Sequence, residues 1–142
     1  MKRFLLALSA AALCLALSPA NPAAFSLRIF EAYRISEGKV VKSGDKSADI
    51  SFYYQTRRMG MISYLGATKI KEFAVRPDPR SLTRAIVETW DDYVAGPAPG
   101  YYVIKGAEGR FYLVKLESFE NQGKAASYWK MTFAPAEEIQ PR

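Results

Sequence analysis

The side chains that most often perform catalysis or bind metal ions are nearly absent from this chain. Its 142 residues include no histidine, and its one cysteine is Cys14. A Ser-His-Asp triad, a Cys-His pair, and zinc or haem iron bound through histidine are therefore excluded. No GxxxxGK[S/T] or GxGxxG string occurs either, so the sequence predicts no phosphate-binding loop.

Two pairs of neighbouring carboxylates remain as candidates for acid–base chemistry, Asp91-Asp92 and Glu137-Glu138. Paired-carboxylate hydrolysis needs two groups that face one substrate, whereas adjacent residues of a helix point in different directions. Charge pairs of this kind commonly lie on a solvated surface. We therefore predict a protein without catalytic activity, and an enzyme that uses carboxylates and tyrosines in an apolar cleft is an alternative.

Two other groups of side chains could bind a ligand. Basic residues gather in one stretch and could attract an anion: Arg57, Arg58, Lys69, Lys71, Arg76, Arg80 and Arg84. The chain also has nine tyrosines, two tryptophans and the methionines Met59, Met61 and Met131. Such side chains can line a pocket for a flat apolar ligand, but a β core uses the same types. Surface solvation and core packing are thus the alternatives to binding.

The first twenty residues have the pattern of a secretory signal. Lys2 and Arg3 precede the apolar run Phe4–Leu17, and Ser18-Pro19-Ala20 supplies small residues for cleavage. The run is shorter than the roughly 20 apolar residues that a membrane span needs. We expect cleavage near Ala20, which leaves a single domain over residues 21–142 in the periplasm or outside the cell.

The predicted cleavage changes what the mature chain can do. Cys14 leaves with the signal, and we expect no lipid anchor on it because the bulky Leu13 stands where a lipidation site has a small residue. The mature chain then has no thiol for a disulfide and no transmembrane span. Loss of Lys2 and Arg3 lowers the formal net charge from +6 to +4, which is too small to predict binding to nucleic acid.

Most of the mature chain reads as β-strands. Tyr101 to Ala134 predicts three strands separated by two glycine turns, with Trp129, Met131 and Phe133 on one face of the last strand. Alternating apolar residues also predict a first strand over Phe25–Ile35, in which Glu31 is out of phase. Shorter strands are expected over residues 40–41, 49–55, 61–65 and 67–75.

One amphipathic helix is predicted over about residues 79–94. Asp78 suits the N-cap and Pro79 the first helical position. The apolar residues that would share one helical face are Leu82, Ile86, Trp90 and Tyr93. The predicted fold class is therefore mainly β (α+β), an antiparallel sheet or meander with one helix.

Two segments resemble HmuY-type haem-binding proteins. SADISFYY (Ser47–Tyr54), preceded by Val40-Val41, is similar to their early segment, and Tyr101–Phe133 is similar to their C-terminal meander. The resemblance implies an extracytoplasmic antiparallel β-fold that captures haem in the cell envelope. It also implies an outer-membrane receptor as the partner that takes over the haem.

No haem ligand is carried over from that family by a matching residue. Its members bind the iron through paired histidines or methionine, and this chain has no histidine. Thioether sulfur can ligate haem iron, so Met59, Met61 and Met131 are the chemical substitutes. Arg57 and Arg58 beside them could bind the haem propionates. The alternative is a structural or interaction protein of the bacterial envelope that keeps the fold without haem.

Overall fold

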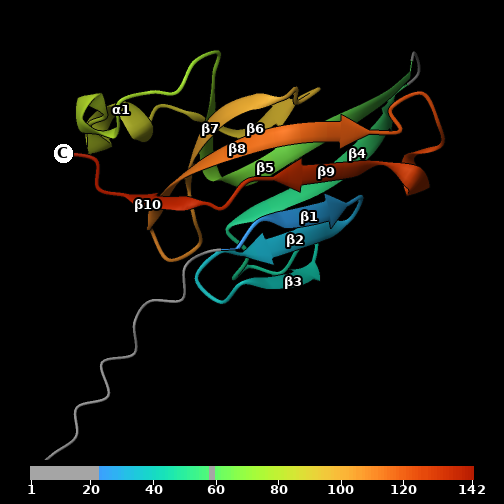
Figure 1. Cartoon of the computed structure of the whole chain (residues 1–142), viewed down its shortest axis with the longest axis horizontal. Coiled ribbons are helices and arrows are strands. Elements are labelled where there is room, and N and C mark those ends of the chain that lie inside the picture. The colour runs from blue at the N-terminus through green and yellow to red at the C-terminus, as the bar shows by residue number, and fades with distance from the viewer. Residues whose placement is uncertain (1–22, 58–59) are drawn as a thin grey trace, which may run out of the picture.

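The computed structural model describes residues 23–57 and 60–142, which form one antiparallel sheet of ten strands (Figure 1). The strands are β1 (Phe25–Arg28), β2 (Glu31–Arg34), β3 (Lys39–Lys42), β4 (Ile50–Arg57), β5 (Gly60–Phe73), β6 (Asp91–Ala95), β7 (Gly100–Lys105), β8 (Phe111–Glu120), β9 (Lys130–Phe133) and β10 (Glu137–Ile139). Their spatial order is β1-β9-β8-β7-β5-β4-β2-β3, with β10 added to β8 and β6 added to β5. The predicted fold class, mainly β and antiparallel, is confirmed.

The sheet curls until its two ends nearly meet. β1 lies against β2 and β4 without forming a ladder with either. At this seam the rings of Phe25 and Tyr33 stack with centroids 4.0 Å apart, and Phe25 also stacks on Phe133 at 4.7 Å. Side chains therefore close the barrel-like sheet where backbone hydrogen bonds do not.

Alternation along the strands fills the interior of the sheet. Tyr112, Val114 and Leu116 point inward from β8, where they meet Met131 and Phe133 of β9. The predicted burial of Trp129, Met131 and Phe133 together is confirmed, although Trp129 lies just before β9, after the single turn η2 (Ala126–Tyr128).

A second apolar cluster covers the outer face of β7 and β8. Phe111 and Leu113 point away from the interior and pack with Val103, Ile139 and residues of the segment after β5. The chain end fastens this layer, since Arg84 N donates to Arg142 O at 2.9 Å and Arg142 N donates to Leu82 O at 3.0 Å. Figure 1 accordingly shows the C-terminus beside α1.

The helix predicted over residues 79–94 is wrong in its extent. The structure has a 3₁₀ turn, η1 (Pro79–Ser81), and one α-helical turn, α1 (Arg84–Val87). Each turn has its own cap, because the side chains of Asp78 and Thr83 accept from separate backbone N–H groups.

The buried face of this segment also differs from the prediction. Leu82, Val87 and Trp90 are buried, whereas Ile86 is 50% exposed and Tyr93 is 46% exposed. Residues 91–95 pair with β5 as a strand, and Val94 lies opposite Leu65. Pairing with β5 decides the structure after Trp90. The spacing of apolar residues along the sequence gives no sign of this pairing.

The first predicted strand is two strands, β1 and β2, joined by a tight turn at Ile29-Phe30. Glu31 marks the break: its carboxylate accepts from Arg28 N across the turn at 2.7 Å. Its charge was out of phase with the apolar alternation because the chain reverses direction just before it.

Asp49 ties three distant parts of the chain together at one end of the sheet. Its carboxylate is buried and accepts from Ile35 N, just after β2, at 2.8 Å. It also accepts from Ala107 N, in the β7–β8 turn, at 3.1 Å. A Cβ on Gly106 would overlap this carboxylate, so the turn needs glycine there. Burial raises the pKa of Asp49, while the backbone N–H donors act in the opposite direction.

We predict that Asp49→Asn lowers the free energy of unfolding at neutral pH by about 1–3 kcal/mol, because an amide NH₂ would replace one acceptor oxygen. The wild-type advantage should depend on pH. Folding raises the pKa of Asp49 above its ordinary 3.8, so the stability linked to its protonation is full below that value and is lost as pH rises through the folded-state pKa, which makes the wild-type advantage larger at acidic than at neutral pH. Urea unfolding of both proteins from acidic to neutral pH measures this difference.

Glu117→Gln, at an exposed carboxylate of β8, is the matched control and should change the free energy of unfolding by less than about 0.5 kcal/mol. A difference between wild type and Asp49→Asn that stays constant with pH would contradict the role assigned to this buried carboxylate.

Candidate functional site

Two of the predicted haem-binding residues, Arg57 and Met61, belong to the β4–β5 hairpin. Arg57 pairs with Gly60 and Thr56 with Met61 through the backbone register, so Arg57 and Met61 flank the hairpin tip. Arg58 and Met59 lie outside the described residues, and so do the side chains of Arg57 and Met61. Met131 is fully buried in the interior core, where it serves packing.

A row of aromatic rings begins next to this hairpin. The rings of Phe30 and Tyr54 lie 5.2 Å apart, and Tyr54 meets Trp129 edge-on at 6.2 Å. Trp129 meets Phe119 at 5.7 Å, and Phe119 meets Phe52 at 5.5 Å. We call Phe30, Tyr54, Trp129, Phe119 and Phe52 the aromatic row. It joins the β1–β2, β4–β5 and β8–β9 ends of the sheet, on the right of Figure 1.

Phe30 is exposed at the outer end of the row on an unfavourable backbone. Its φ is 64°, in the left-handed region that bulky residues rarely adopt, and its side chain is 53% exposed. The turn is fixed, since Phe30 N donates to Phe52 O at 2.8 Å and Ser43 N donates to Phe30 O at 2.9 Å. A strained position that holds an exposed ring is a feature often found at binding sites.

A hollow of about 240 Å³ opens beside the inner part of the row. Its walls are Ser63, Gly96, Pro97, Phe119, Gln122 and Trp129. The Trp129 indole N–H donates to Lys124 O at 3.0 Å, which holds the ring in place. Flat apolar groups can stack on these rings, although ligand pockets are usually larger, about 300–1,000 Å³.

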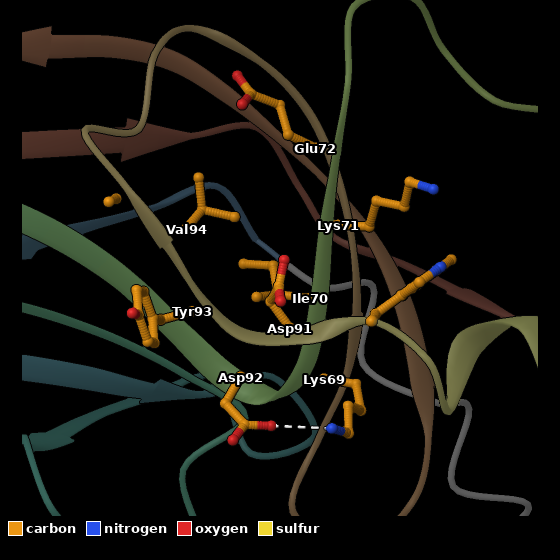
Figure 2. A pocket seen from close by; sticks show the side chains of 10 residues that line it. Lys69, Ile70, Lys71, Glu72, Asp91, Asp92, Tyr93 and Val94 are labelled. Atoms are coloured by element: carbon orange, nitrogen blue, oxygen red, sulfur yellow. Dashed lines mark hydrogen bonds and ion pairs between the residues drawn. The ribbon is translucent and has the colours of Figure 1, made fainter.

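A second hollow, of about 620 Å³, lies between β5 and β6 and has a different chemistry (Figure 2). Figure 2 shows Lys71, Glu72 and Asp91 around it and the ion pair between Lys69 Nζ and Asp92 Oδ1, 3.0 Å apart. Charged side chains of both signs share its wall with Ile70, Tyr93 and Val94, so the groove is less apolar than the sites that flat hydrophobic ligands usually occupy.

Tyrosines line the outer face of β4, β5 and β6. Tyr53 of β4 stacks on Tyr64 of β5 at 5.1 Å, and Tyr64 meets Tyr93 of β6 edge-on at 5.0 Å. Burial is the main cause that raises the pKa of the Tyr53 hydroxyl. Gly66 leaves room for this row, because a Cβ there would come within 3.0 Å of the Tyr53 ring.

Three of the four candidate carboxylates form surface ion pairs, two of them with Lys69 and Arg76 of the basic stretch. Asp92 binds Lys69, Glu137 binds Arg76 at 2.5 Å, and Glu138 lies 4.0 Å from Arg110. Within residues 23–57 and 60–142, no group of three or more His, Cys, Asp or Glu could hold a metal ion. No helix in this part of the chain is long and apolar enough to cross a membrane.

Sequence reasoning missed the aromatic row and the buried carboxylate of Asp49. The ring types were visible, but only the turn at Phe30 and the order of the strands bring them together. Comparison with known proteins found no matching family model, curated protein or solved structure.

The strain at Phe30 can be tested through stability. We predict that Phe30→Asn raises the free energy of unfolding by about 1 kcal/mol, because asparagine tolerates a positive φ. Phe30→Ala is the matched control: it removes the ring but keeps the backbone penalty, so it should give no gain. Urea unfolding measures both variants. Equal losses in both would show that the backbone of Phe30 is not strained.

Proposed function

We propose that this chain is an exported, non-catalytic binding protein that holds a flat apolar ligand against the aromatic row. The observation that carries the proposal is the exposed ring of Phe30, kept on a strained backbone at the end of that row. Haem is the ligand that the HmuY resemblance implies. Export rests on the signal pattern of the first twenty residues.

The described residues fit one part of a haem site. Phe30 is half exposed, and Tyr54 and Phe119 are partly buried, so the accessible parts of these rings could stack on a porphyrin face. The hollow beside them takes only part of such a ligand, so the remainder would lie along the β4–β5 hairpin. The iron ligand would then be Met59 or Met61, and Arg57 and Arg58 would bind the propionates.

Titration of the mature protein with ferric and ferrous haem, followed by the Soret band, tests this proposal. We expect a shift that is stronger for ferrous iron, because thioether prefers that state. Met59→Ala combined with Met61→Ala should abolish the shift while the circular dichroism spectrum stays unchanged. Phe30→Asn should weaken binding about fivefold, since an aromatic contact contributes about 1 kcal/mol.

Tyr93→Ala is the control, since this half-exposed tyrosine of β6 lies outside the aromatic row. It should bind haem like the wild type. No Soret change with either oxidation state would make the haem proposal wrong.

A structural or interaction protein of the envelope is the second candidate. The observation in its favour is that, among the described strands, β3 and β6 each pair with one neighbour, as β1 and β10 also do, so the sheet has open strand edges. Open edges are common sites for the addition of a further strand.

A further inference from the structure

Two of the open strand edges, those of β3 and β6, carry opposite charge. β6 begins with Asp91 and Asp92, whereas β3 has Lys39 and Lys42 at its two ends. β6 pairs only with β5, and β3 only with β2. Figure 1 shows β3 along the lower margin of the molecule and β6 in its upper part, so the two strands lie on opposite sides of the molecule.

Asp92 pairs with Lys69, but two other charges of these edges form no ion pair within the described residues. Their ion pairs involve neither Asp91 nor Lys42. Glu31 stands opposite Lys42 in the β2–β3 register, but its carboxylate accepts from Arg28 N instead. Each edge therefore offers an unpaired charge to an incoming strand.

An exposed apolar side chain accompanies the charge on each edge. Tyr93 is two residues after Asp91 and is 46% exposed, and Val40 is two residues before Lys42 and is 45% exposed. Residues two apart on a strand share a face, so each edge presents one charged and one apolar side chain side by side. Charged residues often protect a strand edge from pairing, but protection does not require that a second edge carry the opposite charge beside an apolar side chain.

We propose that the β3 edge of one copy of this chain adds to the β6 edge of a second copy. In an antiparallel pairing with Asp91 opposite Lys42, Tyr93 comes opposite Val40 and on the same face. Opposite charges and aromatic–β-branched pairs are both favourable directly across a ladder. Val40 would then extend the tyrosine row Tyr53–Tyr64–Tyr93 onto the next copy.

This contact is head-to-tail. It uses two different surfaces that lie on opposite sides of the molecule, so each copy can bind one neighbour at β3 and another at β6. Such contacts build rings or open chains rather than closed dimers. The proposal does not depend on haem binding, since it uses neither the aromatic row nor the β4–β5 tip.

Charge-swapped variants of the mature protein test the pairing. The weight-average mass of the wild type, measured by sedimentation velocity over a concentration series, should rise beyond that of a dimer. Asp91→Lys and Lys42→Glu should each weaken association on the order of tenfold, because like charges then face each other. An equimolar mixture of the two variants should restore association. In the mixture the two substituted edges carry opposite charges and can pair, and the two unsubstituted edges still pair Asp91 with Lys42.

Two exposed residues of β8 supply the controls. Lys115→Glu and Glu117→Lys make the same charge changes away from both edges and should leave association unchanged. Circular dichroism checks that each variant is folded. The proposal is overturned if the wild type stays monomeric at every concentration, or if the mixture does not associate. It is also overturned if Lys42→Glu associates like the wild type, since that result indicates pairing of β6 with β6.

Discussion

The fold depends on one buried carboxylate. Asp49 immediately precedes the strand β4 and accepts from the backbone N–H groups of Ile35, just after β2, and of Ala107, in the β7–β8 turn. These parts lie on different sides of β4 in the sheet order, so no ladder could join all three. Burial of a charged group without partners is costly, and the two N–H donors offset that cost only while the sheet is curled. The carboxylate thus links the curvature of the sheet to the position of its turns.

Curling of the sheet has consequences at both of its faces. Inside, it brings β1 against β2 and β4, where Phe25 and Tyr33 stack across the seam. Outside, it leaves β3 and β6 at the margins with open edges. At one end it gathers the aromatic row next to the β4–β5 hairpin. The proposed ligand site and the proposed contact between copies therefore use different surfaces of one architecture.

The sequence allowed the β class and the buried face of the last strand to be predicted, because alternation reports which side of a strand is apolar. The helix predicted over residues 79–94 was wrong in its extent. Leu82, Ile86, Trp90 and Tyr93 follow a helical spacing, but residues 91–95 pair with β5 as a strand of the sheet. Phe30 was not recognised as a turn residue, since aromatic residues rarely adopt a positive φ. Asp49 looked like an ordinary polar residue before a strand, because its partners lie 14 and 58 positions away in the chain.

Hydrogen exchange of two backbone amides tests the central role of Asp49 most directly. Ile35 N and Ala107 N both donate to its carboxylate, although one follows a strand and the other lies in a turn. If the Asp49 carboxylate holds the curled sheet together through these two hydrogen bonds, both amides should exchange only on global unfolding. They should then exchange as slowly as the amide of the buried residue Val103 in β7. Exchange of Ala107 as fast as that of its exposed neighbour Glu108 would contradict the account, because the turn would then open without the sheet.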